Sequence, residues 1–230
     1  LLRAGNQLGK SMAGGAEAAM HATGRYPDGW QGRRWDRPTV GWGGGLTGEL
    51  TRDNVQRILL GPIKERGTGM IPPRDIFEVT PARGVADLVD TILVRHVSGG
   101  TSRIRLKHYA QGREAWQSDS VDWLWLDEEP PEDVYTEALT RTNATGGCIW
   151  LTFTPLLGMS AVVSRFLMEA SPDRHDTNMT IEDAEHIPIE DRARIIASYK
   201  AHEREARTKG VPILGSGRVF PVEEASITVP

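Results

Sequence analysis

The chain has 230 residues, of which 39% are hydrophobic and 25% charged, with a formal net charge of −4 at pH 7. This balance is ordinary for a globular protein, the length suits one α/β domain, and the net acidity argues against a broad basic face for nucleic acid. No apolar run reaches the roughly eighteen residues of a membrane span, and the N-terminus has no secretory pattern, which argues against membrane-spanning and exported proteins.

The first motif is a candidate phosphate-binding loop. The run AGNQLGKS over residues 4–11 is close to the pattern G-x-x-x-x-G-K-[ST]. In such a loop backbone N–H groups wrap a phosphate, the lysine reaches the β and γ oxygens, and the hydroxyl binds Mg²⁺. The loop therefore predicts a nucleotide site made of Gly5, Asn6, Gln7, Leu8, Gly9, Lys10 and Ser11. Because Gly-Lys-Ser also occurs in chance turns, the loop alone does not decide the question.

The loop departs from the pattern in two ways. Ala4 stands where the pattern has glycine, and we expect the neighbouring Gly5 to supply the positive φ. A loop of this kind follows a buried strand, yet only Leu1, Leu2 and Arg3 precede it. We therefore expect an N-terminal segment, with the groups that read the nucleotide base, to be missing from this sequence.

Helix and strand signals alternate in the next part of the chain, as in a parallel sheet covered on both sides. They predict a helix over 11–23 ended by Gly24, a strand over 39–42, a helix over 51–60 capped by Thr51 or Asp53, and a hairpin of strands 91–97 and 103–109. These signals place the chain in the α/β class.

An acidic strand end follows. Residues 121–126 are almost continuously apolar, as in a strand buried on both faces, and Asp127 and Glu128 come directly after them. Ligands of open α/β sheets bind at this end of a strand, so the two acids suit a metal ligand and a base. Glu132 and Asp133 are better explained as favourable charges at the start of a helix that runs to about Arg141, and Glu129 fits either role.

The last predicted elements follow the acidic strand. A strand over 147–153 leads to Thr154, whose hydroxyl suits a sensor of the γ-phosphate or of the attacking water; the alternative is an ordinary strand residue before a proline turn. Helices are predicted over 159–170 and over 188–209, the second ended by Gly210. Seven residues suit phosphate contacts or, alternatively, are ordinary solvated charges: Arg33, Arg34, Arg37, Arg103, Arg105, Lys107 and His108.

Together the motifs N-Q-L-G-K-S, L-D-E-E-P-P and T-F-T-P, in this order and separation, resemble the ATPase domain of the large terminase subunit of tailed bacteriophages. The likeness runs from about Gly5 to Pro221. It implies a P-loop NTPase of the RecA-like (ASCE) type, with a mainly parallel central sheet flanked by helices, over residues 1–214. It also implies an ATPase that uses ATP and Mg²⁺.

The resemblance implies a motor that packages double-stranded DNA through a portal into procapsids in the host cytoplasm. Its expected partners are the small terminase subunit and further copies in a homo-oligomeric ring, with no membrane. Residues 215–221 resemble the linker to an RNase H-like nuclease domain, so residues 215–230 are expected to begin that linker. The nuclease carboxylates would then be absent, and this chain would not cut DNA.

The resemblance also implies residue roles. Glu128 would polarise water, Lys10 would balance charge, Ser11 and Asp127 would hold Mg²⁺, and Thr154 would act as the sensor. Many terminases carry an arginine inside the loop where this chain has Asn6, which leaves Arg3, Arg113 and Arg141; we predict that Arg113 acts as a finger from a neighbouring subunit. Two alternatives stay open: a RecA-like helicase or DNA translocase without a packaging role, and a nucleotide-binding scaffold without turnover.

Overall fold

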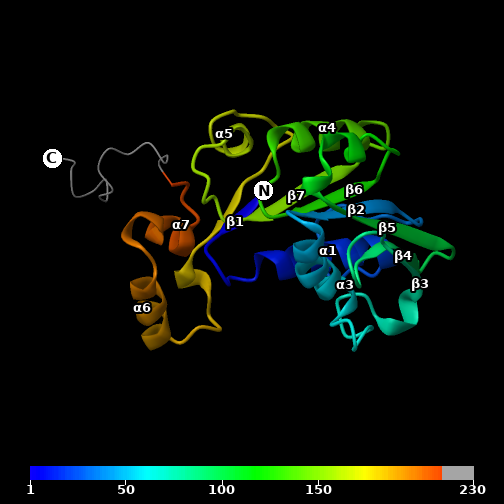
Figure 1. The fold of residues 1–230 in the computed structure, drawn as a ribbon, viewed down its shortest axis with the longest axis horizontal. Helices are drawn as coiled ribbons and strands as arrows, with labels where there is room; N and C mark the ends of the chain where they lie inside the picture. Colours follow the sequence, from blue (N-terminus) through cyan, green and yellow to red (C-terminus); the bar gives the residue numbers. More distant parts are fainter. Residues whose placement is uncertain (214–230) are drawn as a thin grey trace. The chain divides into compact units, whose positions relative to one another are not determined.

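Eight strands in a mainly parallel sheet, flanked by helices, form the core of the computed structural model, which describes residues 1–213 (Figure 1). The chain divides into two compact units. The larger unit is Ser11–Leu151, and the smaller unit is Leu1–Lys10 with the chain from Thr152 onward. The predicted fold class is confirmed. The run proposed as a linker, residues 215–221, lies outside the described residues.

The larger unit contains the strands in the order β3-β4-β5-β2-β6-β7. The central strand β2 pairs in parallel with β5 and β6, whereas β3, β4 and β5 pair antiparallel. The bounds are β2 Val40–Gly45, β3 Ile76–Pro81, β4 Val89–Arg95, β5 Thr101–His108, β6 Trp123–Asp127 and β7 Cys148–Phe153, whose last two residues belong to the smaller unit. The predicted hairpin is thus present as β4 and β5, while β3 was not predicted.

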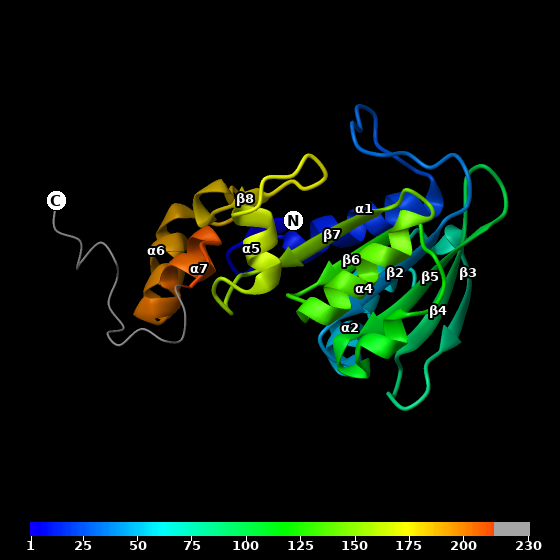
Figure 2. The same cartoon turned by 90° about the horizontal axis from the view of Figure 1, so that it is seen from above.

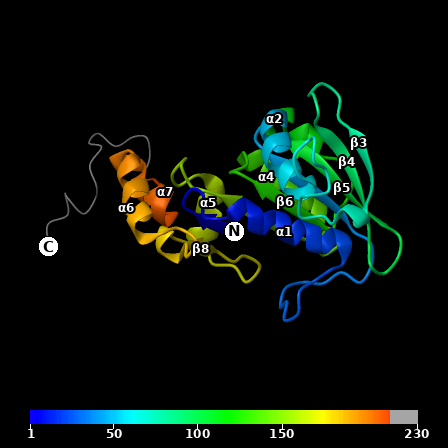
Figure 3. The ribbon, with the colours of Figure 1, turned by 90° about the horizontal axis from the view of Figure 1, so that it is seen from below.

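Helices cover both faces of this unit. Helix α1 (Lys10–Thr23) and α3 (Arg57–Leu60) lie on one face and α4 (Glu132–Asn143) on the other, as the two opposite views in Figures 2 and 3 show. Helix α3 ends a helical stretch that begins with α2 (Gly48–Thr51) and includes a π-helical segment over 52–56. The predicted cap at Thr51 or Asp53 is wrong, because the helix begins earlier and Thr47 Oγ1 accepts the N–H of Leu50 at 3.2 Å.

Glycines in β2 make room for the aromatic core. A Cβ on Gly41 would lie 2.0 Å from the Trp123 ring, and one on Gly44 would lie 2.6 Å from the Trp116 ring. Both tryptophans are fully buried. The glycines therefore let large side chains of neighbouring elements cover this strand. It extends to Gly45 rather than ending at Trp42 as predicted.

The smaller unit contains β1 and the elements that follow β7. Strand β1 pairs in parallel with β7 on one side and β8 on the other. It is the strand expected before the loop, and it has only three residues. The bounds are β1 Leu2–Ala4, α5 Ala161–Leu167, β8 Thr177–Met179, α6 Ile189–Ser198 and α7 Arg204–Lys209.

The single helix predicted over 188–209 is wrong. Helix α6 ends at Ser198, Tyr199 is extended with ψ of 146°, and α7 begins at Arg204. In α7 the side chains of Ala206 and Thr208 are buried, and Asn6 N–H donates to the Arg207 carbonyl at 2.9 Å. A straight helix through Tyr199 could not bring α7 to these contacts, so the chain bends despite a sequence without a helix breaker there.

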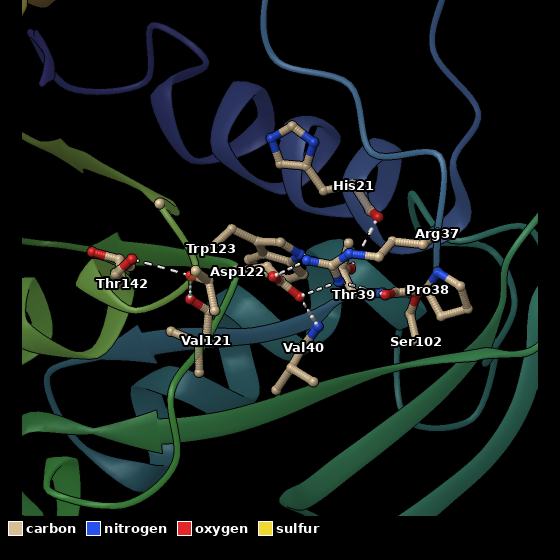
Figure 4. A network of polar contacts seen from close by, with 12 residues as sticks. His21, Arg37, Pro38, Thr39, Val40, Ser102, Val121, Asp122, Trp123 and Thr142 are labelled. Atoms are coloured by element: carbon tan, nitrogen blue, oxygen red, sulfur yellow. Dashed lines mark hydrogen bonds and ion pairs between the residues drawn. The ribbon is translucent and has the colours of Figure 1, made fainter.

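A polar network fixes the start of β6 (Figure 4). The carboxylate of Asp122 accepts two bonds from Arg37, at 2.7 and 3.1 Å, and one from the N–H of Val40 at 2.8 Å. Trp123 Nε1 donates to Thr39 Oγ1 at 2.9 Å, and that hydroxyl donates onward to the His21 carbonyl at 3.1 Å. Asp122 therefore joins the segment before β2 to β6, at the end opposite Asp127.

Candidate functional site

The loop between β1 and α1 has two left-handed residues, Gln7 with φ of 60° and Gly9 with φ of 87°. The prediction that Gly5 supplies the positive φ is wrong. Gly5 is instead required by a close approach, since a Cβ there would lie 2.3 Å from the carbonyl oxygen of Arg207. The next residue, Asn6, donates its N–H to the same oxygen at 2.9 Å. Helix α7 thus fixes the start of the loop.

Lys10 and Ser11 are the first two residues of α1. The Lys10 side chain is largely buried, and its Nζ donates to the Gly5 carbonyl at 2.9 Å, so the side chain folds over the loop. The N-terminus of a helix presents N–H groups that have no partner within the helix. The loop therefore combines an ammonium group with the positive end of a helix dipole.

Thr154 lies beside the start of this loop within the smaller unit. Its Oγ1 donates to the Ala4 carbonyl at 2.8 Å and is 3.1 Å from Asn6 Oδ1. The side chain is buried. The structure therefore brings together two residues that the sequence singled out 148 positions apart, with Thr154 holding the end of β1 and contacting the side chain of Asn6.

The acidic end of β6 has an unusual backbone. All five residues of β6 are buried, including Asp127, and the following Glu128 is left-handed with φ of 62°. This conformation costs a residue with a Cβ about 1–2 kcal/mol, so the surroundings must hold it. The Tyr109 hydroxyl donates to the Asp127 carbonyl at 2.9 Å and lies 3.1 Å from the Glu128 carbonyl oxygen.

Of the three acids that follow Glu128 most closely, the last two belong to the start of α4. Glu132 and Asp133 are in its first turn, and an Asp133 carboxylate oxygen accepts the N–H of Val134 at 2.8 Å. Their interpretation as helix-start charges is confirmed. Glu129 is buried, and it precedes Pro130 and Pro131.

The three candidate arginines are all paired with carboxylates, and they differ in exposure. Arg3 binds Asp176 at 2.9 Å, and the side chain of Arg141 binds Glu137 at 3.0 Å. Arg113 also binds Glu137 at 3.0 Å, but 56% of its side chain is exposed, compared with 14% for Arg3 and 27% for Arg141. The Arg113 hydrogen bond is the main cause that lowers the pKa of Glu137. Arg113 is therefore the most accessible of the three.

The other basic residues named from the sequence engage protein groups. Arg37, Arg103 and Arg105 bind carboxylates, the last of these at 3.6 Å, and Arg33 and Arg34 stack on Trp35 and Tyr26. Lys107 is buried with its Nζ 4.3 Å from the centre of the Trp42 ring, and its pKa is lowered to about 8 by desolvation. This side chain is therefore part of the core rather than a phosphate-binding surface.

Among residues 1–213, no cluster of three or more His, Cys, Asp or Glu side chains is arranged to hold a metal ion. None of the helices over the same residues has the length and apolar character needed to span a membrane.

Comparison with known proteins supplies the family. The model for the N-terminal part of the T4likevirus-type terminase large subunit matches residues 1–227. The chain belongs to the large terminase subunit family. The large terminase subunit of Salmonella phage P22 is 48% identical over 97% of this chain and 49% of its own length. That of Enterobacteria phage LP7 is 39% identical over 80% of this chain and 40% of its own length. The chain thus spans about half the length of these relatives or less.

Solved large terminases share the fold. The large terminase of a thermophilic bacteriophage matches with a TM-score of 0.66 at 17% identity, over 93% of this chain and 47% of that one. An ATPase-domain variant from Thermus phage P74-26 matches with a TM-score of 0.57 at 18% identity, over 90% of this chain and 86% of that one. The first of these two proteins has also been solved with ADP and with ATP-gamma-S.

Two functional contacts were not predicted from the sequence. Tyr109 follows β5, 18 residues before Asp127, whose carbonyl it contacts. The Arg207 carbonyl meets the loop from α7. Both contacts use backbone oxygens, which no residue pattern identifies. The only sequence signal was indirect, since Tyr109 begins the run of residues 109–114, which also resembles the large terminase subunits.

Proposed function

We propose that this chain is the ATP-hydrolysing motor domain of a terminase large subunit that drives the packaging of double-stranded DNA into procapsids. The observation that carries the proposal is the loop at the start of α1, with left-handed Gln7 and Gly9 and the folded-over Lys10, in a chain that also has an acidic turn at the end of β6. Family membership and the nucleotide complexes of the thermophilic-phage terminase support it.

In this proposal residues 5–11 bind the phosphates of ATP. Left-handed residues within a turn allow successive N–H groups to line one concavity, which suits an anion. The Lys10 ammonium would leave the Gly5 carbonyl for the β and γ oxygens, since a phosphate is a stronger partner than a neutral carbonyl. Binding of nucleotide would therefore change the hydrogen bonding of Gly5.

The acids supply the remaining chemistry. The hydroxyl of Ser11 and the carboxylate of Asp127 are hard oxygen donors of the kind that Mg²⁺ prefers, so the side chains present fit this ion. A bound magnesium ion would neutralise charge on the β and γ oxygens. Glu128 would orient the attacking water and polarise it, because its left-handed backbone aims it differently from the strand residues before it.

Two more residues have proposed roles. Thr154 would sense loss of the γ-phosphate. Its hydrogen bonds with Ala4 and Asn6 support this role, because a shift of the loop would lengthen or break them. Arg113 would complete the site of a neighbouring subunit. Its exposure supports this role, since a finger must reach a second molecule.

The proposed partners follow from the family. They are double-stranded DNA, the portal of the procapsid, the small terminase subunit and further copies of the chain in a ring, acting in the host cytoplasm during virus assembly. Arg37, Arg103 and Arg105 are each paired with a carboxylate of the protein, which lowers their capacity to bind phosphates. This pairing supports a local rather than a broad contact with DNA.

Glu128→Gln tests the proposed chemistry. The amide keeps the size of the side chain but cannot act as a base, so phosphate release should fall by about a hundredfold or more while ATP-gamma-S binding persists. Phosphate release is measured with double-stranded DNA and portal-bearing procapsids, and binding by calorimetry. Glu129→Gln is the matched control and should retain hydrolysis. Loss in Glu129→Gln alone would reassign the base, and a wild-type protein that binds ATP without releasing phosphate would be a scaffold.

A further inference from the structure

The turn that carries Glu128 is held by a residue from the segment that follows β5. Glu128 is one of three non-glycine residues with positive φ among residues 1–213, and it directly follows the buried end of β6. An extended or helical backbone would suit glutamate better, so the left-handed turn needs partners outside it. The Tyr109 hydroxyl meets the two carbonyls on either side of this turn, at 2.9 Å for Asp127 and 3.1 Å for Glu128.

Tyr109 is itself rigidly placed. It begins a short 3-10 turn after β5, in which His108 N–H donates to the Gln111 side chain at 3.1 Å and Ala110 N–H donates to the Leu46 carbonyl at 3.1 Å. The Tyr109 ring is buried with its centre 5.8 Å from that of Trp116. Because the ring is fixed by packing, its hydroxyl oxygen is held in one place. This donor can therefore set the position of the carbonyls that it contacts.

We propose that Tyr109 is a positioning residue for Glu128, holding the left-handed turn through the carbonyls of Asp127 and Glu128. The inference rests on the proposed function, in which Glu128 orients the attacking water. Tyr109 makes no proton transfer in this role. Its burial and the neighbouring carboxylates raise the pKa of its hydroxyl well above the ordinary value, so it stays a donor over the working pH range.

The segment between β5 and β6, which begins with Tyr109, also carries Arg113. Between Tyr109 and β6 the chain is anchored by a bond from Lys107 Nζ to the Ala115 carbonyl and by the buried ring of Trp116, whose centre is 5.9 Å from that of Trp42. Arg113 leaves this segment and binds Glu137. The segment from Tyr109 to Trp116 therefore both contacts the backbone of Glu128, the proposed base, and carries Arg113, the proposed finger. A displacement of this segment would move both.

The test begins with Tyr109→Phe, which removes the hydroxyl and keeps the ring. We expect phosphate release to fall about tenfold, as for loss of one orienting hydrogen bond, with ATP-gamma-S affinity within about twofold of wild type. Tyr26→Phe is the matched control, because the Tyr26 hydroxyl also lies within the larger unit, where it accepts the N–H of Trp35 at 2.8 Å and hydrogen-bonds His21 Nδ1 at 3.1 Å. It should leave phosphate release unchanged.

A double-mutant cycle separates positioning from a general structural role. If Tyr109 acts through the Glu128 carboxylate, Tyr109→Phe should cause no further loss in a Glu128→Gln background, as measured by single-turnover hydrolysis. An equal loss in both backgrounds would overturn the proposal. Wild-type hydrolysis by Glu128→Gln would instead overturn the assignment of Glu128 as the base, on which this inference rests, while ATP hydrolysis itself would stand.

Hydrogen exchange gives a readout that needs no activity. In the free protein, the amides of residues 127–129 should exchange about tenfold faster in Tyr109→Phe than in wild type, while those of α4 beyond its first turn should not change. Unchanged exchange at 127–129 would show that the hydroxyl does not hold the turn. The same measurement on Tyr26→Phe should match wild type at these residues.

Discussion

The carbonyl oxygen of Arg207 lies so close to Gly5 that a Cβ on that residue would come within 2.3 Å of it. The obstacle is backbone, which cannot swing aside as a flexible side chain can. The same oxygen accepts the N–H of Asn6. The first turn of the loop and the last turn of α7 are therefore one packed unit, and a change in either must move the other.

Gly5→Ala tests this relationship. The methyl group would push α7 from the loop, so we expect the free energy of unfolding to fall by about 1–3 kcal/mol and nucleotide affinity to weaken. Chemical unfolding and ATP-gamma-S calorimetry measure the two effects. Gly99→Ala is the control, because a Cβ there meets no atom within 4 Å, although its positive φ also strains alanine. Wild-type affinity in Gly5→Ala would contradict the contact.

Glu128→Gly should separate stability from activity. Glycine adopts a positive φ without a Cβ penalty, and this relief exceeds the entropy that it loses on folding, so the free energy of unfolding should rise by up to about 1 kcal/mol. Phosphate release should be lost, since the carboxylate is gone. The control is Asp87→Gly, because Asp87 has φ of 61° and is exposed. It should gain similar stability and keep full hydrolysis; destabilisation of Glu128→Gly would argue against strain.

Burial lowers the pKa of Lys107 from 10.5 to about 8, which predicts a pH-dependent stability. Between these values the unfolded chain binds more protons than the folded one, so the contribution of Lys107 to the free energy of unfolding rises with pH through this window. Below pH 8 both states are protonated and the full cost of burying the charge remains, about 3 kcal/mol.

Urea unfolding of Lys107→Met and wild type between pH 7 and about 10.5 checks this sign. The stability of wild type relative to the variant should increase as the pH rises. Lys64→Met, at an exposed position, should show no such trend relative to wild type. A difference between Lys107→Met and wild type that is constant over the whole range would show that the ammonium is not desolvated.

Arg113→Ala should slow hydrolysis only when subunits are assembled. Arg113 and Arg141 both bind Glu137, so Arg141→Ala disturbs the same carboxylate and is the matched control. We expect at least a tenfold loss of phosphate release for Arg113→Ala with procapsids and DNA, and little loss for Arg141→Ala. Equal losses in the two variants would mean that both act through Glu137 and that neither is a finger.

Local patterns were enough to predict the elements of the site. The uninterrupted apolar run into Asp127 identified β6, and the loop with its following helix identified α1. Single residues were singled out where one residue type suits the chemistry, as with Lys10 and Thr154, and the structure places Thr154 beside the start of the loop. The proposed roles of Lys10, Ser11, Arg113, Asp127, Glu128 and Thr154 all stay predictions.

Tertiary contacts account for what the sequence did not reveal. The break at Tyr199 follows from the packing of α7, and the reason for Gly5 is a backbone oxygen contributed from far along the chain. The cap at Thr47 was missed because Thr51 and Asp53 are equally good capping types and nothing local decides among them. Strand β3 has only two partly buried apolar residues, so it lacks the alternation that marks a strand.

The tryptophans that fill the glycine-rich strand have an optical consequence. All seven tryptophans of the chain lie between residues 30 and 150, which is wholly within the larger unit. Tryptophan fluorescence therefore reports the melting of that unit rather than that of the chain segments that include α6 and α7. A denaturation curve followed by emission and by far-ultraviolet dichroism would coincide only if both units lose their structure in one step.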